Sequence, residues 1–304
     1  MVPRVVSAND ATERGTPPWT WRAVADLIRL DNQAGTWLLL LPSLWSLILA
    51  NHGRPPIRLL AVFVLGAFVM RSLGVVFNDL ADRRFDQHVA RTRNRPLASG
   101  RLTPRQALLV AFGLAVLAAA LVSTLNWLTI FLSPIALFLA AVYPFSKRWI
   151  QIPQAVLGIA FGWGTIMAWG ASRGTIASSA WWLFAATACW AVAYDTIYAL
   201  QDREDDRRIG VKSSALFFGR AVPAAVGLFL LGMLICLTIV GWLSELGPEY
   251  YVAMVILAGL FSWQARRLRF PVTPSQAFTM FQEHVLAGVV ILVTLWLSTW
   301  HESP

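Results

Sequence analysis

Long apolar segments, separated by short polar stretches, run through almost the whole chain. They lie near residues 34–50, 57–77, 107–124, 127–145, 153–171, 180–199, 222–242, 250–264 and 283–300. A helix needs about 20 apolar residues to cross the hydrocarbon core of a bilayer, and most of these segments approach that length. Because 57% of the residues are hydrophobic and only 13% are charged, the composition excludes a disordered or ordinary soluble protein. The sequence therefore predicts an all-α polytopic membrane protein with nine transmembrane helices.

The positive charges predict the orientation of these helices. If the amino terminus is cytoplasmic, 21 of the 25 Lys and Arg residues fall in cytoplasmic regions. Such an excess is typical of the cytoplasmic side of a membrane protein. We expect a flexible tail at residues 1–20, followed by a single transmembrane domain at residues 21–304. The formal net charge of +9 follows from this orientation and requires no nucleic-acid partner.

Two acidic clusters follow directly on apolar segments, at residues 78–86 (NDLADRRFD) and 201–206 (QDREDD). Oxygen ligands recur every four residues, at Asn78, Asp82 and Asp86 and at Asp202 and Asp206. On a helix, this spacing places the side chains on one face. Oxygen ligands select hard cations such as Mg²⁺. The clusters therefore predict that a polyphosphate is held through magnesium at the membrane surface.

The two clusters belong to a weak internal repeat, at about residues 57–145 and 180–264. In each half, an apolar segment leads to an acidic cluster with a pair of arginines, then to a Gly-Arg-x-x-Pro run and a further apolar segment. Both halves run in the same direction. A parallel pseudo-repeat would let the clusters face each other across a cavity.

Basic and aromatic residues elsewhere in the chain are further candidates for substrate binding. The only two lysines, Lys147 and Lys212, are expected to contact phosphate oxygens together with Arg148, although a surface lysine remains the alternative. The rings of Trp163 and Tyr198 are candidates to shield a carbocation through cation–π attraction, with plain packing as the alternative.

Three runs of the chain resemble the UbiA superfamily of intramembrane prenyltransferases. They are residues 78–100 (NDLADRRFDQHVARTRNRPLASG), 143–148 (YPFSKR) and 194–214 (YDTIYALQDREDDRRIGVKSS), and a fourth run at residues 158–164 (GIAFGWG) shares the resemblance. Within the family, these runs are most similar to the 4-hydroxybenzoate polyprenyltransferases. The first cluster looks like the family motif Asn-Asp-x-x-Asp-x-x-x-Asp, and the second like Asp-x-x-x-Asp. The chain differs at residues 32–35 (NQAG), where family members often have Lys-Pro-Ile-Gly.

This resemblance implies nine transmembrane helices around a central cavity that opens to the cytoplasm and laterally to lipid. It also implies a Mg²⁺-dependent enzyme of the bacterial inner membrane with its active site facing the cytoplasm. It would transfer a polyprenyl group from polyprenyl diphosphate to 4-hydroxybenzoate, ortho to the hydroxyl, in ubiquinone-type quinone biosynthesis. Asn78, Asp82, Asp86, Asp202 and Asp206 would hold the metal, and these four aspartates would be catalytic. We also expect Arg83 to bind the acceptor carboxylate and Asp195 to orient or deprotonate its phenol.

Two alternatives remain open at this stage. A related enzyme for another aromatic acceptor, such as homogentisate or dihydroxynaphthoate, would share the metal site. A cation-coupled transporter would also keep acids within a repeat-built bundle. The position of the acids at segment ends, beside cationic residues suited to phosphate, favours the enzyme.

Overall fold

The computed structural model describes residues 19–300, and all regular structure within this range is helical. The predicted tail therefore lies almost entirely outside the described residues. The long helices are α2 (Ala34–Ala50), α3 (Ile57–Asp86), α4 (Pro104–Val122), α5 (Trp127–Trp149), α6 (Pro153–Arg173), α7 (Ser178–Ala199), α10 (Val222–Leu243), α11 (Pro248–Arg267) and α12 (Pro274–Trp300). The short ones are α1 (Trp21–Leu27), η2 (Leu200–Asp202), α8 (Arg203–Ile209), α9 (Ser214–Phe218) and η3 (Gly219–Ala221).

Each predicted apolar segment corresponds to one long helix, so the predicted all-α class is confirmed for the described residues. Seven of the described helices are long and apolar enough to cross a membrane. The apolar helix α2 has 17 residues and falls short in length, and α11 also falls outside that set. Several helices extend beyond the apolar segments: residues 78–86 are added to α3 and residues 274–282 to α12.

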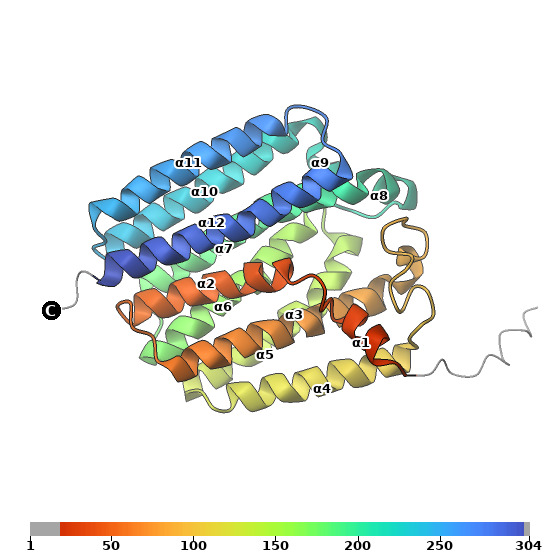
Figure 1. Cartoon of the computed structure of the whole chain (residues 1–304), viewed down its shortest axis with the longest axis horizontal. Coiled ribbons are helices and arrows are strands. Elements are labelled where there is room, and N and C mark those ends of the chain that lie inside the picture. The colour runs from red at the N-terminus through yellow and green to blue at the C-terminus, as the bar shows by residue number, and fades with distance from the viewer. Residues whose placement is uncertain (1–18, 301–304) are drawn as a thin grey trace, which may run out of the picture.

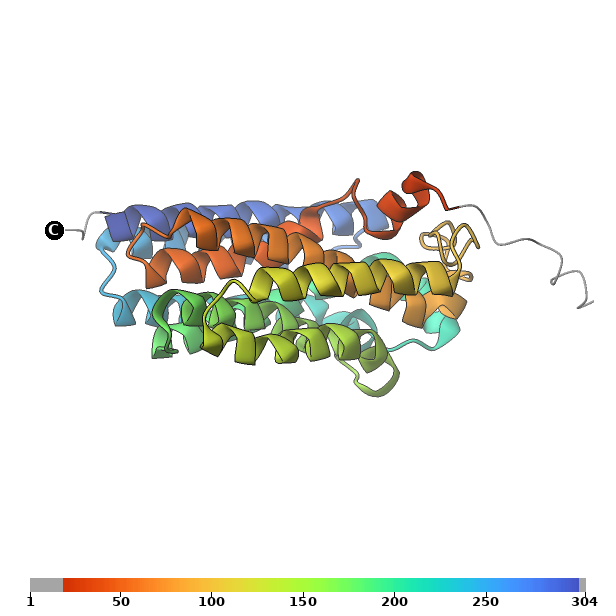
Figure 2. The same cartoon turned by 90° about the horizontal axis from the view of Figure 1, so that it is seen from below.

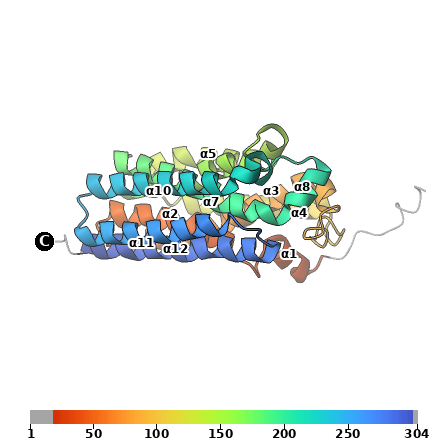
Figure 3. The ribbon, with the colours of Figure 1, turned by 90° about the horizontal axis from the view of Figure 1, so that it is seen from above.

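The long helices lie side by side with roughly parallel axes (Figure 1) and stack in layers when the molecule is turned (Figures 2 and 3). Helices α10 and α11 form one edge of the molecule, and α4 lies at the opposite edge (Figure 1). Helices α1 and α8 and the acidic end of α3 share one end of the bundle. The carboxyl terminus lies at the other end (Figure 1).

The main hydrophobic core lies where α7 packs against α2, α6, α10 and α12. Its large rings Trp45 and Trp190 are fully buried and lie with their centroids 5.1 Å apart. The indole N–H of Trp45 donates to the carbonyl of Gly288 at 3.0 Å, and that of Trp190 donates to Nδ1 of His284 at 2.9 Å. These bonds satisfy donors that have no access to water inside a membrane.

Helices α6 and α7 approach closely because α6 presents glycines to α7. A Cβ atom on Gly158 would lie 2.7 Å from the carbonyl oxygen of Ala188, and one on Gly162 would lie 2.9 Å from a ring carbon of Phe184. Small residues allow membrane helices to pack at short range. This contact fixes the position of α7, which carries Asp195 and leads into the second acidic cluster.

We predict that Gly158→Ala destabilises the protein by about 1–3 kcal/mol, because the added methyl group meets backbone that must shift. Thermal unfolding in detergent, followed by tryptophan fluorescence, measures the effect. Gly113→Ala on α4 is the matched control, since a Cβ atom there meets nothing within 4 Å. Equal melting temperatures for the two variants would contradict the close contact.

Candidate active site

A cavity of about 860 Å³ is enclosed mainly by α2, α3, α4, α5, α6 and α7, with the 87–103 loop, α8 and α12 completing its wall. Its polar part is formed by the two acidic clusters. Its apolar part is lined by side chains of α3 to α6, including Phe63, Ala119, Leu137 and Phe161. Along α3, Phe63 and Asn78 are separated by about 22 Å at 1.5 Å per residue. The cavity therefore has two connected parts. We call the part at the two acidic clusters the charged mouth, and the long apolar part between α3 and α6 the hydrophobic arm.

The first cluster lines this cavity because α3 continues as a helix to Asp86. Asn78, Asp82 and Asp86 follow one another at one-turn intervals along the cavity wall, as the four-residue spacing predicted. Asp79 is only 1% exposed and forms ion pairs with Arg29 and Arg95.

The second cluster is built differently from the expected continuous helix. Helix α7 ends at Ala199, and a 3₁₀ turn contains Asp202. Helix α8 then ends at Ile209 and is capped by Gly210, which has a left-handed φ of 79°. Asp202 and Asp206 nevertheless both line the same cavity as the first cluster.

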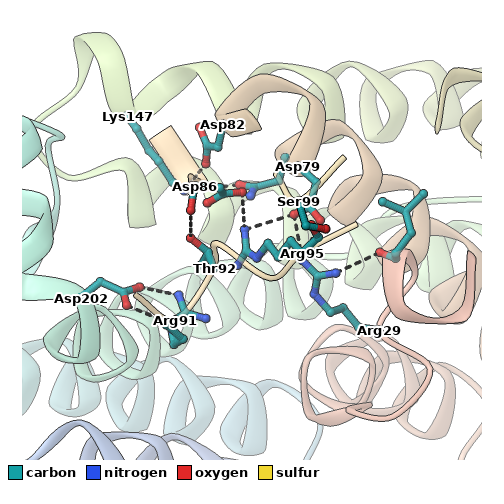
Figure 4. A network of polar contacts seen from close by, with 12 residues as sticks. Arg29, Asp79, Asp82, Asp86, Arg91, Thr92, Arg95, Ser99, Lys147 and Asp202 are labelled. Carbon is teal, nitrogen blue, oxygen red and sulfur yellow. Dashed lines mark hydrogen bonds and ion pairs between the residues drawn. The ribbon is translucent and has the colours of Figure 1, made fainter. Parts of the chain in front are cut away.

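Basic side chains neutralise the acids within the cavity (Figure 4). Nζ of Lys147 lies 3.0 Å from a carboxylate oxygen of Asp82 and 3.3 Å from Oδ1 of Asn78. Arg95 donates to Asp86 at 2.9 Å. The guanidinium of Arg91 donates to both carboxylate oxygens of Asp202, and it also donates to the hydroxyl of Tyr198 at 3.0 Å.

Arg91 and Arg95 of the 87–103 loop stay charged in this setting. Burial alone would lower the pKa of Arg91, but the hydrogen bond and charge of Asp202 outweigh burial and raise it above the usual arginine value. The pKa of Arg95 is likewise raised, because the charges of Asp79 and Asp86 outweigh its burial. Clustered carboxylates of this kind require cations beside them. The loop thus brings Arg95 to the neighbouring Asp86 and Arg91 to Asp202, which is 111 residues away in sequence.

The oxygen donors of the two clusters fit a magnesium ion whose coordination is completed by a bound substrate. Within residues 19–300, no group of three or more His, Cys, Asp or Glu side chains is placed to hold a metal ion. Protein sites for Mg²⁺ commonly use one or two carboxylates, with substrate phosphates and water completing the coordination. The two acidic clusters, which line one cavity, offer hard oxygen donors of this type.

The structure brings most of the predicted site residues to one cavity. Those that line it are Asn78, Asp82, Asp86, Lys147, Asp195, Tyr198, Asp202, Asp206 and Lys212. Three predicted residues lie outside the cavity wall. Arg83 is exposed to the surroundings, Arg148 is exposed and donates to the carbonyl of Ala81 at 3.1 Å, and Trp163 donates to the carbonyl of Leu132 at 3.0 Å.

Sequence reasoning missed Arg71, which lines the cavity from within α3. It precedes Asn78 by seven residues, or two helical turns, just as Asp195 precedes Asp202. No hydrogen bond or ion pair joins the Arg71 guanidinium to another described residue. The available signal was an arginine inside an apolar segment, because such a residue is costly in a membrane and usually functional.

Helix α2 leaves room for this arginine at Gly35. A Cβ atom there would lie 2.4 Å from Nε of Arg71 and 2.8 Å from one of its terminal nitrogens. The chain departs from the frequent family sequence at residues 32–34, but the glycine that accommodates Arg71 is present.

Comparison with known proteins gives the class of this protein. The model of the UbiA prenyltransferase family matches residues 39–287. A 4-hydroxybenzoate octaprenyltransferase of Vibrio cholerae is 46% identical over 279 residues, which cover 92% of this chain and 98% of the relative. The enzyme of the same name from Tolumonas auensis is 46% identical over 281 residues, with the same coverage. The chain therefore belongs to the UbiA prenyltransferase family, and it is an integral membrane protein.

Solved structures share the fold. A UbiA homolog from Aeropyrum pernix superposes with a TM-score of 0.74 at 21% identity, covering 86% of this chain and 97% of that one. A UbiA homolog from Archaeoglobus fulgidus, bound to GPP and Mg²⁺, superposes with a TM-score of 0.69 at 16% identity, covering 90% and 99%.

Proposed function

We propose that this protein transfers a polyprenyl group from polyprenyl diphosphate to 4-hydroxybenzoate, at the ring carbon ortho to the hydroxyl, in ubiquinone-type quinone biosynthesis. One observation carries the proposal: a single cavity joins a charged mouth to a hydrophobic arm, with Arg71 and Asp195 two turns below the acids. Relatives at 46% identity, named 4-hydroxybenzoate octaprenyltransferase, support the same acceptor.

The charged mouth suits the diphosphate. Lys147, Arg91 and Arg95 now balance carboxylates, and together with Lys212 they can neutralise phosphate oxygens as the leaving group departs. Magnesium held by the two acidic walls, at Asn78, Asp82, Asp86, Asp202 and Asp206, would neutralise the diphosphate charge further. The Mg²⁺-bound UbiA homolog from Archaeoglobus fulgidus supports the choice of this metal.

The acceptor site lies at the junction with the hydrophobic arm. The unpaired guanidinium of Arg71 suits a benzoate carboxylate, because arginine donates two parallel hydrogen bonds to such a group. This assignment replaces Arg83, whose side chain is outside the cavity wall. Asp195 is placed to orient or deprotonate the phenol. The allylic carbon–oxygen bond breaks, a bond forms from that carbon to the ring, and the displaced ring proton leaves to a base.

Aromatic side chains can protect the allylic cation before it reacts. Tyr143, Tyr194 and Tyr198 all line the cavity. The ring of Tyr198 packs against Phe281 with a centroid distance of 4.8 Å, so its orientation is fixed. Such faces attract cations and exclude water that would trap the intermediate.

We also propose nine membrane-spanning helices, a cytoplasmic amino terminus and a location in the bacterial inner membrane. The positive charges and the shared end of α1, α3 and α8 support this arrangement (Figure 1). In it, the cavity mouth faces the cytoplasm. The 21–304 region would form one domain, in which residues 57–145 and 180–264 are parallel pseudo-repeats.

Prenyl transfer in membranes containing the protein tests the proposed reaction. Labelled 4-hydroxybenzoate and geranyl diphosphate would be supplied with and without magnesium, and homogentisate and dihydroxynaphthoate would be tested as rival acceptors. We expect magnesium-dependent prenylation of 4-hydroxybenzoate. Transfer to another acceptor alone would overturn the acceptor, and no transfer by folded protein to any of them would overturn the enzyme assignment.

Gly35→Ala should weaken use of 4-hydroxybenzoate, because the new methyl group displaces the Arg71 guanidinium. We expect KM for 4-hydroxybenzoate to rise about tenfold, the loss of one charged hydrogen bond, while KM for geranyl diphosphate stays unchanged. Steady-state kinetics on both substrates check this selectivity. Gly113→Ala is the control, and equal changes in both KM values would contradict the role of Gly35.

A further inference from the structure

A second cavity lies apart from the active site, between α10 and α11 at the edge of the bundle. Its volume is about 630 Å³. Most of its wall is apolar, and small residues such as Gly227 and Ala258 form part of it. A Cβ atom on Gly227 would lie 3.7 Å from Cβ of Ala265, which is van der Waals contact. At this point the groove is therefore open only because residue 227 has no side chain. Figure 1 shows that the edge formed by α10 and α11 has no further helix outside it.

Three arginines gather at one end of this groove. Arg220 precedes α10, Arg266 lies in the last turn of α11, and Arg269 follows α11. None of the three forms an ion pair with a described residue, and Arg266 donates only to the carbonyl of Ser262 in its own helix at 3.3 Å. The neighbouring Arg267 differs, because it pairs with Glu283 at 3.1 Å. The groove therefore ends in uncompensated positive charge.

Aromatic side chains place this end of the groove at the level of lipid headgroups. Trp263 is 52% exposed and lies under the guanidinium of Arg267 at 4.6 Å, and Phe270 is 73% exposed. Exposed tryptophan beside arginine is typical of the membrane–water interface. The apolar length of the groove then lies beside the acyl chains, with the arginines beside the phosphates.

We propose that this groove binds an anionic phospholipid, with its phosphate between Arg220, Arg266 and Arg269 and one acyl chain between α10 and α11. Basic pockets between membrane helices on the cytoplasmic side recognise such headgroups. A zwitterionic lipid would bring its own cation next to three arginines. Free phosphate would leave the apolar groove unused. The uncompensated charge and the apolar wall together therefore select an anionic lipid.

Lipid binding to the purified, delipidated protein tests this site. Native mass spectrometry would measure binding of dioleoylphosphatidylglycerol, dioleoylphosphatidylcholine and glycerol 3-phosphate. We expect the anionic lipid to bind at least tenfold more tightly than the zwitterionic one, and glycerol 3-phosphate not to compete. Each arginine should contribute about fivefold, which corresponds to about 1 kcal/mol near an anionic headgroup.

Three variants make the assignment specific. The triple variant Arg220→Gln, Arg266→Gln, Arg269→Gln should lose the preference for the anionic lipid. The charge-matched triple variant Arg22→Gln, Arg84→Gln, Arg105→Gln changes exposed arginines elsewhere and should keep it. Gly227→Leu should fill the groove and weaken the binding of both lipids while the arginines remain.

Cooperative thermal unfolding would establish that each variant is folded, and Arg269→Gln alone would replace the triple variant if that one fails. Equal binding of the two lipids to the wild-type protein would overturn the proposal. So would a preference that survives loss of the groove arginines, or full competition by glycerol 3-phosphate.

Discussion

Asp82→Asn and Asp206→Asn should each lower kcat for magnesium-dependent prenyl transfer by about 10²–10³-fold. Each change keeps the size of the side chain but removes one negative charge from an acidic wall of the cavity. The loss of metal-mediated neutralisation of the departing diphosphate falls on the transition state, where charge develops, so the effect is of the size seen when one such stabilising group is removed. Single-turnover kinetics with labelled geranyl diphosphate measure it.

Asp205→Asn is the matched control for Asp206→Asn. Asp205 is the adjacent residue on α8, but it does not line the cavity, so we expect nearly unchanged kcat. The magnesium concentration for half-maximal activity should rise in the two active-site variants and stay constant in the control. If Asp205→Asn lowered kcat as much as Asp206→Asn, the proposed choice of magnesium ligands in the second acidic cluster would be wrong.

Arg71→Ala should reduce kcat/KM for 4-hydroxybenzoate by about 10- to 100-fold, whereas Arg83→Ala should leave it nearly unchanged. The expected loss is that of a hydrogen-bonded charge pair inside the cavity, worth about 1.5–3 kcal/mol. Arg83 is exposed and lies outside the cavity wall, so its removal takes no contact from the acceptor. Steady-state kinetics of the two variants in the same membranes check the contrast.

An acceptor without a carboxylate shows whether Arg71→Ala acts by removing carboxylate recognition or by damaging the fold. Phenol should be prenylated poorly by the wild-type protein and no worse by Arg71→Ala, because it offers no partner to the guanidinium. A larger effect of Arg83→Ala than of Arg71→Ala on 4-hydroxybenzoate would restore the assignment made from the sequence alone.

The helical architecture was predictable because hydrocarbon imposes strict demands on a chain. Backbone groups inside a bilayer must be satisfied within the segment, so long apolar segments can only be helices or barrel strands. The segments near 57–77 and 180–199 therefore appear as α3 and α7. The first acidic cluster was also predictable, because a four-residue spacing fixes which side chains share a helical face. The spacing of the second cluster did not predict the 3₁₀ turn that carries Asp202. Family membership, expected from these clusters, is confirmed by the match over residues 39–287.

The cavity wall itself was not predictable in the same way. Arg83 lies one residue beyond Asp82, and a rotation of about 100° along α3 places it on another face. Arg71 is more distant in sequence but returns to the cavity after two turns. Trp163 lies on α6 near the cavity, yet its N–H is bound to Leu132 and its ring packs on Phe184. Proximity in sequence was a poor guide, because the direction of a side chain decides what it contacts.

The sequence by itself determined the long helices, the acidic face of α3 and the family, since each rests on local hydrophobicity, on the period of one helix or on motifs along the chain. Only the tertiary structure decided which cations meet these acids. Arg91 reaches Asp202 across 111 residues, and Lys147 reaches Asp82 across 65. Such pairs depend on how α3, α5, α7 and the 87–103 loop pack together. Which cation meets which acid depends on the distances between helices, and the spacing of residues along one segment does not encode those distances.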